Sequence, residues 1–295
     1  MTDQTLNDYM QTRKEWFEKR LDTFLRKLPI TEKLRESMLY SLMAGGKRIR
    51  PILLFATLEE LGGKPDQGLS VAIAIEMIHT YSLIHDDLPA MDDDELRRGR
   101  ATNHIVYGEG TAVLAGDGLL TAAFQVLAED PLLSETLKVQ LIAMLASAAG
   151  PEGMVGGQED DLEAEEKVLN LDQLISVHRR KTGRLIKFPI EAAARIAGAS
   201  EAEQMQLSAY ADNIGLAFQI GDDILDITGN QNELGKPIGS DLDNHKNTYV
   251  SLLTLDGARE ELAKQIDRAI GCLNEIGLGQ SVLAQLANYL LHRTH

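Results

Sequence analysis

Two segments of this chain are apolar around most of the circumference that a helix would give them. They span residues 71–88 and 207–227. A helix that is apolar on all sides belongs in the middle of a helical bundle, because none of its faces suits contact with water. Each segment nevertheless ends in a group of aspartates. Local rules tend to fail at functional sites, so this conflict indicates where a site lies.

Apolar residues recur at helical spacing in most of the other segments as well. The alternating pattern that is typical of strands is nearly absent. The periodicity predicts helices at residues 21–28, 38–43, 52–61, 111–128, 134–149, 171–197, 200–227, 248–254, 258–276 and 281–291. We therefore predict an all-α fold in which residues 1–295 form a single-domain helical bundle. A stretch rich in Gly, Asn and Asp, residues 228–247, is predicted to be a long loop, and such loops are often functional.

The charge and the cysteine content exclude several classes of protein. The chain carries 29 Lys and Arg against 45 Asp and Glu, and this net charge of −16 argues against general nucleic-acid binding. A single cysteine, Cys272, cannot form a disulfide within the chain. The first residues lack the basic and apolar regions of a secretory signal. The longest uncharged stretch, residues 276–292, is interrupted by polar residues. We therefore expect a cytoplasmic protein without a membrane span.

The aspartates at the ends of the two apolar segments form two clusters. Their acidic members are, in the first, Asp86, Asp87, Asp92, Asp93, Asp94 and Glu95 and, in the second, Asp222, Asp223 and Asp226. Asp222 and Asp226 share one face of a helix because they are four residues apart. Asp86 and Asp92 would not share a face of an unbroken helix, but Pro89 between them is expected to end or kink it. The chain can then turn Asp92 back toward Asp86.

Carboxylates packed this closely repel one another unless something neutralises them. At an effective dielectric constant of about 20, two like charges about 4 Å apart cost about 4 kcal/mol. The donors are all oxygens, without a matching set of Cys or His, which favours Mg²⁺ or Mn²⁺ over zinc. Mg²⁺ commonly binds one or two carboxylates together with substrate phosphates, so a phosphate or diphosphate ligand is indicated. One such cluster alone could equally be a solvated helix end.

Local groups of basic residues accompany the acidic clusters. The sequence GGKRIRP at residues 45–51 places Lys47 and Arg50 between a glycine-rich turn and a new helix, where an anion can bind. Arg97 and Arg98 follow the first acidic cluster, and arginine suits bidentate phosphate contacts. These cations fit the phosphate ligand that the carboxylates indicate.

Further basic residues lie before and after the second cluster. Lys181 and Thr182 precede a glycine inside a predicted helix, where glycine costs about 1 kcal/mol relative to alanine, which predicts a kink or a close approach. Lys236 and Lys246 lie in the predicted loop, which could close over a site. His79 lies on the first apolar segment, and a lone histidine in such a helix is more often a core residue than a ligand.

The chain resembles the trans-prenyl diphosphate synthases, and among them the bacterial enzymes that make farnesyl diphosphate. DDLPAMD at 86–92 and DDILD at 222–226 are similar to the two aspartate-rich motifs of that family. GGKRIRP, KTG at 181–183 and GKPIGSDLDNHKNTY at 235–249 occur in the family's order. The resemblance implies an all-α, isoprenoid synthase-like bundle around a deep central cavity, and a homodimer. It also implies condensation of isopentenyl diphosphate with dimethylallyl and then geranyl diphosphate.

The resemblance also implies roles for individual residues. Asp86, Asp92 and Asp222 would ligate Mg²⁺, three ions with substrate bound, and Mn²⁺ could replace it. Nearby ligands or water holders would be Asp87, Asp223 and Asp226. The allylic diphosphate would be held by Arg97, Lys181, Gln219 and Lys236, with Thr182 at the cation-forming end. The diphosphate of isopentenyl diphosphate would be bound by Lys47, Arg50, His79 and Arg98.

Tyr81 and Ser82 lie five and four residues before Asp86, and five helical residues rise about 7.5 Å. In family terms, an aromatic residue here, together with the long first motif that has four residues between its aspartates, implies a product that stops at C15, although Tyr81 could also be an ordinary core residue. A geranylgeranyl diphosphate synthase is the nearest alternative. A terpene cyclase is disfavoured by GGKRIRP and by an aromatic content of only 5%. A non-catalytic helical scaffold or cation-binding protein is the alternative of a different class.

Overall fold

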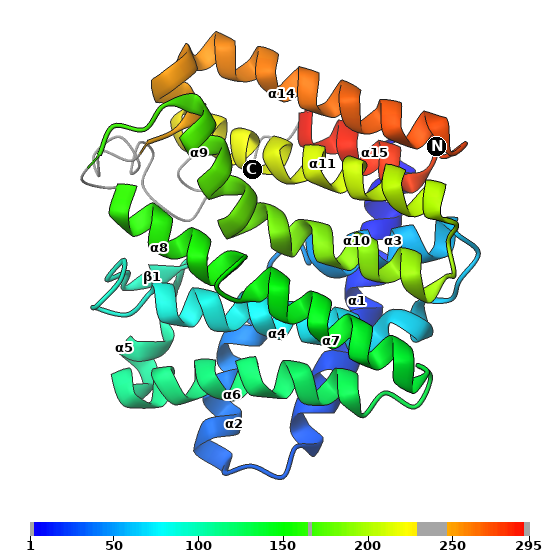
Figure 1. Cartoon of the computed structure of the whole chain (residues 1–295). Coiled ribbons are helices and arrows are strands. Elements are labelled where there is room, and N and C mark those ends of the chain that lie inside the picture. The colour runs from blue at the N-terminus through cyan, green and yellow to red at the C-terminus, as the bar shows by residue number, and fades with distance from the viewer. Residues whose placement is uncertain (1–2, 165–166, 229–246, 292–295) are drawn as a thin grey trace. The chain divides into compact units, whose positions relative to one another are not determined.

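The computed structural model describes residues 3–164, 167–228 and 247–291, which are almost entirely helical, as the sequence predicts (Figure 1). The helices, in chain order, are α1 (Asp3–Lys27), α2 (Glu32–Leu42), α3 (Ile49–Glu60), η1 (Pro65–Gly68), α4 (Leu69–Asp86), α5 (Asn103–Tyr107), α6 (Glu109–Ala128), α7 (Glu135–Ala149), α8 (Met154–Ala164), α9 (Leu171–His178), η2 (Arg179–Gly183), α10 (Arg184–Ile196), α11 (Glu201–Thr228), α14 (Tyr249–Glu275) and α15 (Val282–Leu291). Within the described part, the only strands are β1 (Leu96–Arg97) and β2 (Arg100–Ala101), which form an antiparallel hairpin.

The chain divides into two compact units, and each is described by itself. The first comprises residues 1–55 and 65–142. Its central helix is α4, the first of the two apolar segments, which packs against α6 and α2. Most of the α4 side chains are buried, from Val71 to Ile84. A fully buried side chain of this size contributes about 1.5–3 kcal/mol, so the burial of α4 outweighs the cost of the charges at its end.

The second unit comprises residues 56–64 and 143–295. Its central helix is α11, the second apolar segment, which packs between α14 and α10 (Figure 1). Tyr210 of α11 is fully buried, and its hydroxyl donates a hydrogen bond to the carbonyl oxygen of Leu283 on α15 at 2.8 Å. Both helices that the sequence predicts to be central are therefore central, each in its own unit.

The structure differs from the sequence prediction at several places, and three of them concern the second unit. Helix α8 was not predicted, because its sequence has two glycines and no apolar period. The predicted helix at 171–197 is interrupted at residues 179–183 by a π-helical turn, η2, at the point where Gly183 predicts a kink. The predicted helices at 248–254 and 258–276 form α14, which contains a break at Thr254, with φ of 67° and ψ of 166°.

Among the described residues, one helix, α6, is long and apolar enough to cross a membrane by length and composition alone. Of its most apolar window, 44% is buried within the chain. Core helices of globular proteins pass the same test, so this finding is weak evidence for a span. The apolar side chains that α6 leaves exposed include Val113 and Leu114.

Candidate functional site

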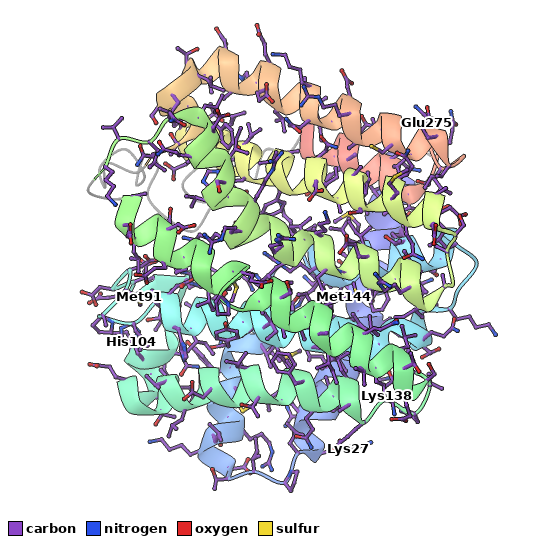
Figure 2. The ribbon with its side chains drawn as sticks, viewed as in Figure 1. Lys27, Met91, His104, Lys138, Met144 and Glu275 are labelled. Carbon is purple, nitrogen blue, oxygen red and sulfur yellow. The ribbon has the colours of Figure 1, made fainter. Side chains whose placement is uncertain are left out.

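The first aspartate cluster lies in a tight turn at the C-terminal end of α4. Pro89 follows the helix, because a proline disfavours helical conformation in the residue before it. The main-chain N–H of Asp92 donates a hydrogen bond to the carbonyl oxygen of Asp86 at 2.8 Å. The chain thus turns back as the position of Pro89 predicts. Asp92 is exposed and Asp86 half-buried. Met91 of this turn is labelled in Figure 2.

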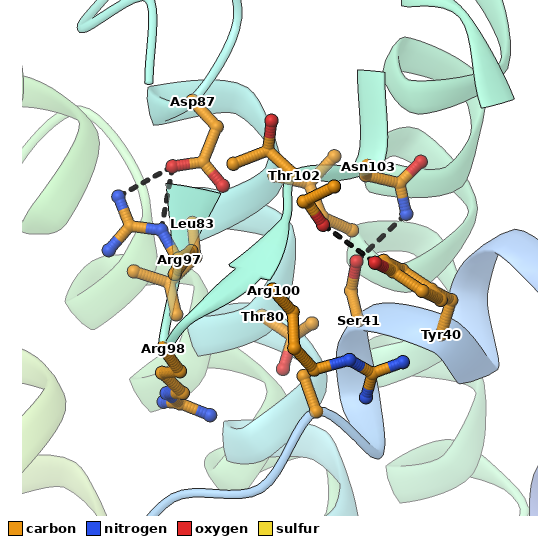
Figure 3. A pocket seen from close by; sticks show the side chains of 13 residues that line it. Tyr40, Ser41, Thr80, Leu83, Asp87, Arg97, Arg98, Arg100, Thr102 and Asn103 are labelled. Atoms are coloured by element: carbon orange, nitrogen blue, oxygen red, sulfur yellow. Dashed lines mark hydrogen bonds and ion pairs between the residues drawn. The ribbon is translucent and has the colours of Figure 1, made fainter. Parts of the chain in front are cut away.

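Asp87, the neighbour of Asp86, is turned into the protein and is 3% exposed. Its Oδ1 accepts a hydrogen bond from Nε of Arg97 at 2.6 Å, and a terminal nitrogen of the same guanidinium lies 2.6 Å away (Figure 3). Burial raises the pKa of Asp87, although the hydrogen bond from Arg97 opposes that shift. This ion pair ties the turn after α4 to strand β1.

A small cavity lies beside this ion pair, and Asp87, Arg97, Arg100 and Tyr40 help to line it (Figure 3). Its volume of about 30 Å³ leaves room for roughly one water molecule, which is too little for a diphosphate. The Tyr40 hydroxyl donates a hydrogen bond to the carbonyl oxygen of Ala101 at 2.7 Å. The Arg100 guanidinium lies 4.5 Å from the centre of the Tyr40 ring. The residues that line the cavity therefore join α2 to the hairpin.

The GGKRIRP loop lies against the hairpin. The Arg98 guanidinium donates a hydrogen bond to the carbonyl oxygen of Gly45. Lys47 and Arg50 are half-buried in this loop and at the start of α3. The structure thus brings together Arg98 and the loop that carries Lys47 and Arg50, which lie about fifty residues apart in sequence. Lys47, Arg50 and Arg98 all belong to the set that the resemblance assigns to the diphosphate of isopentenyl diphosphate.

Arg48, the middle cation of this loop, is instead part of the core and is 4% exposed. Its guanidinium lies 2.6 Å from a carboxylate oxygen of Glu76 on α4 and 2.9 Å from one of Glu18 on α1. Nothing in the sequence distinguishes Arg48 from its basic neighbours. Its role in the core becomes visible only in three dimensions, because its partners lie about thirty residues away in the chain.

His79 lies on α4, seven residues or about two turns before Asp86, and therefore on nearly the same face. Burial, and then the guanidinium groups of Arg50 and Arg98, lower the pKa of His79 well below its ordinary value of 6.5. The ring is therefore neutral near pH 7. A neutral histidine among arginines can donate a hydrogen bond to an anion without adding to the repulsion between the cations.

The second aspartate cluster lies within α11, where Asp222 is half-buried and Asp223 and Asp226 are buried. The Asp223 carboxylate is fully engaged. It accepts a hydrogen bond from the side-chain amide of Gln219 at 3.0 Å and one from the main-chain N–H of Tyr249 at 2.8 Å. Asp223 therefore joins α11 to the first residue of α14.

Gln219 also connects this cluster to the π-helical turn. Its amide oxygen accepts a hydrogen bond from the Thr182 hydroxyl at 3.2 Å. The preceding side chain in the turn, Lys181, forms an ion pair with Asp161 of α8, with Nζ and Oδ2 2.5 Å apart. Three predicted site residues, Lys181, Thr182 and Gln219, are thus brought together. Sequence analysis did not identify Asp161, because nothing in the pattern predicts helix α8.

The predicted chain-length residues lie on the same helix as Asp86. Tyr81 is 6% exposed, and its ring packs edge-to-face on His85 with 5.7 Å between ring centres. Burial, and then the carboxylate of Asp86, raise the pKa of Tyr81 to about 12. The Ser82 hydroxyl donates a hydrogen bond to the carbonyl oxygen of His79 at 2.9 Å. Tyr81 is therefore buried and uncharged near pH 7, and it lies near the first carboxylate.

Lys236 and Lys246 lie outside the described residues. No group of three or more His, Cys, Asp or Glu side chains poised to hold a metal ion occurs within residues 3–164, 167–228 and 247–291. The metal roles of the aspartates therefore stay predictions. Their donor chemistry fits Mg²⁺, because the half-buried or exposed members of both clusters offer carboxylate oxygens.

Comparison with known proteins identifies the family. The polyprenyl synthetase family profile matches residues 31–284. The farnesyl diphosphate synthase of Geobacillus stearothermophilus is 48% identical, over 100% of both chains. The geranylgeranyl diphosphate synthase of Cyanophora paradoxa is 44% identical, over 91% of this chain and 94% of its own.

Solved structures agree. The crystal structure of a geranyltransferase from Legionella pneumophila superposes with a TM-score of 0.88 at 33% identity, covering 99% of this chain and 98% of the other. A match of this extent, in sequence and in fold, is what common descent produces. This chain carries one aspartate motif at the end of α4 and the other within α11, and it shares its helical architecture with that geranyltransferase. It belongs to the polyprenyl synthetase family.

Proposed function

We propose that this chain is a farnesyl diphosphate synthase. It condenses isopentenyl diphosphate with dimethylallyl diphosphate and then with geranyl diphosphate. The observation that carries the proposal is on one face of α4, where His79 lies among arginine side chains about two turns before Asp86. Seven helical residues rise about 10.5 Å, so this face carries a diphosphate-binding group and a metal-binding carboxylate about two helical turns apart.

Asp86, Asp92 and Asp222 would hold Mg²⁺, and three ions are expected with substrate bound. When bound, the metal neutralises the charge that develops on the leaving diphosphate. Asp87, Asp223 and Asp226 support these groups from buried positions. Mn²⁺ would suit the same oxygen donors.

The chain's own residues bind and orient the two substrates. Lys47, Arg50 and Arg98 hold the diphosphate of isopentenyl diphosphate, and neutral His79 donates a hydrogen bond to it. The allylic diphosphate is held by Arg97, Lys181, Gln219 and Lys236, with Thr182 beside the carbon that ionises. Charge-assisted contacts of this kind fix the diphosphates in place, so that the reacting carbons meet in one geometry.

The reaction begins when the allylic C–O bond breaks and its electron pair leaves with the diphosphate. The double bond of isopentenyl diphosphate then forms the new C–C bond, and a proton is lost to the released diphosphate. Apolar side chains of α4 such as Ile78 and Ile84 are buried around this end of the helix. They exclude water, which would otherwise convert the allylic cation to an alcohol.

Tyr81 and Ser82 would set the product length by closing the hydrocarbon pocket. The alternative is a geranylgeranyl diphosphate synthase, whose pocket would be longer. Replacing Tyr81 with alanine is expected to shift the product from C15 toward C20, as measured by chromatography of the dephosphorylated products. An unchanged C15 product from Tyr81→Ala would remove the assignment.

A homodimer is proposed because α5 and α6 expose apolar side chains that a second copy would cover. Ile105, Val106, Val113 and Leu114 are each more than a third exposed. Monomers rarely leave such groups of apolar side chains in water unless they mark an interface. Sedimentation should give twice the mass of 32.4 kDa.

A cytoplasmic location is also proposed. Cytoplasmic proteins keep their thiols reduced, and Cys272, which forms no disulfide within the chain, is consistent with that environment.

The activity is tested by release of diphosphate from geranyl and isopentenyl diphosphates at increasing MgCl₂ concentration. We expect release that depends on Mg²⁺ and a C15 product. A helical scaffold or a cation-binding protein would release no diphosphate at any MgCl₂ concentration. That result would refute the proposed function.

A further inference from the structure

The π-helical turn η2 holds two residues of the proposed allylic diphosphate site, Lys181 and Thr182, between α9 and α10. A π turn adds a residue to a helical turn and is often found at functional sites. Its main chain is confined on both sides. A Cβ on Gly157 of α8 would lie 2.2 Å from the Lys181 nitrogen, and a Cβ on Gly215 would lie 3.0 Å from Gly183 Cα. The backbone of the turn is therefore held by direct contact with two neighbouring helices.

Two consecutive acidic residues of α8 face two consecutive basic residues of the turn. Asp160 pairs with Arg180, and Asp161 pairs with Lys181 at 2.5 Å. Arg180 has a second anchor, because it also donates a hydrogen bond to the carbonyl oxygen of Pro151 at 2.9 Å. The two ion pairs are thus similar in charge, exposure and position but hold different cations.

The pair of Asp161 and Lys181 is only partly buried, with side-chain exposures of 29% and 28%. Ion pairs near the surface contribute little to folding. A lysine side chain, however, has many rotamers, and fixing one of them costs entropy that binding must overcome. A carboxylate that orients the ammonium beforehand lowers that cost. An ammonium has three N–H donors, so a hydrogen bond to Asp161 does not by itself prevent one to a diphosphate oxygen.

We propose that Asp161 is a positioning residue, which holds Lys181 in the orientation that binds the diphosphate of the allylic substrate. This inference rests on the proposed function, in which Lys181 contacts that diphosphate. Asp161 acts through Lys181 and is not itself a ligand of the substrate.

The direction in which diphosphate binding changes when Asp161 is neutralised distinguishes this role from simple electrostatics. Removing a negative charge beside an anion site should strengthen anion binding if charge alone matters. If Asp161 orients Lys181, its neutralisation should weaken binding instead. Asp160 is the matched control, because Asp160→Asn makes the same change of charge one residue away and disturbs Arg180 rather than Lys181.

The test compares Asp161→Asn, Asp160→Asn and the unchanged full-length protein. Isothermal titration with inorganic diphosphate and MgCl₂ gives binding without turnover, and steady-state kinetics give KM for each substrate. For Asp161→Asn we expect Kd for diphosphate and KM for geranyl diphosphate to rise roughly tenfold. KM for isopentenyl diphosphate should stay within about twofold, as should all three values for Asp160→Asn.

A third variant shows whether the effect passes through the lysine. In a Lys181→Met background, Asp161→Asn should change Kd for diphosphate by less than about twofold, because the two residues act as a unit. Unchanged or tighter diphosphate binding by Asp161→Asn alone would overturn the proposal, as would equal effects of Asp160→Asn. If the unchanged protein binds diphosphate through this pair yet releases none from its substrates, the proposed function fails while the positioning role stands.

Discussion

The two aspartate motifs read alike in sequence but are built differently. The first lies in the turn after α4, where Asp92 is exposed. The second lies inside α11, where Asp226 is buried. A turn leaves its carboxylates in water at little cost. A helix in the middle of its unit must find hydrogen-bond partners for every buried carboxylate.

Within both motifs, the two adjacent aspartates nevertheless differ from each other in the same way. In each adjacent pair of aspartates the first, Asp86 or Asp222, is half-buried, and the second, Asp87 or Asp223, is buried with a defined partner. Arg97 holds Asp87, and a main-chain N–H holds Asp223. In both motifs, therefore, the second aspartate of the pair secures the local structure, and the first keeps part of its carboxylate at the surface.

The largest effect is expected for one exposed and one half-buried aspartate among the proposed metal ligands, one from each motif. Asp92→Asn and Asp222→Asn should each lower kcat/KM by roughly 10³-fold, because charge stabilisation of the leaving group is lost. The melting temperature of Asp92→Asn should change little, since that side chain is exposed. Diphosphate release and calorimetry measure the two effects. Retention of more than about a tenth of the activity by either variant would contradict the assignment.

The next effect concerns His178, which is buried beside Tyr249, Asp161 and Lys181. Burial lowers the pKa of His178 from 6.5 to about 4. Between these two pH values the unfolded chain binds a proton that the folded chain does not, so stability is lost as pH falls through this range. The loss is at most about 3 kcal/mol. Urea unfolding at several pH values gives the free energy of unfolding as a function of pH. Between pH 4 and 6.5 this free energy should change less steeply with pH for His178→Phe than for the unchanged protein. An equal pH dependence of the two proteins would contradict this prediction.

A smaller loss is expected when the tether in the second motif is weakened. Asp223 accepts two hydrogen bonds, and asparagine would place an N–H against one of the donors. Asp223→Asn should therefore lower the free energy of unfolding by about 1–3 kcal/mol. Asp93→Asn in the first motif is the control, because that residue is exposed and its φ of 52° suits asparagine equally. Equal stability of both variants, measured by urea unfolding, would remove the distinction between the motifs.

The smallest effect is a gain in stability next to that tether. Thr254 links the first turn of α14, which Asp223 holds, to the rest of the helix, with φ of 67° and ψ of 166°. This conformation is nearly restricted to glycine. Thr254→Gly should raise the free energy of unfolding by about 1 kcal/mol, after the entropy cost of glycine is subtracted. A lower midpoint in urea would show that the hydrogen bond from the Gly257 N–H to Thr254 Oγ1, 3.4 Å long, outweighs the backbone strain.

The helices and the central place of α4 and α11 follow from the sequence alone, because helical periodicity and apolar composition act within a few residues. The turn at Pro89 and the break near Gly183 follow from it too, since they depend on local backbone preferences. Which charged residues pair with one another depends instead on the packing of the helices. Arg48 meets Glu76 across 28 positions, and Lys181 meets Asp161 across 20. Such pairs depend on how helices pack, and the letters of a motif do not specify packing between distant segments.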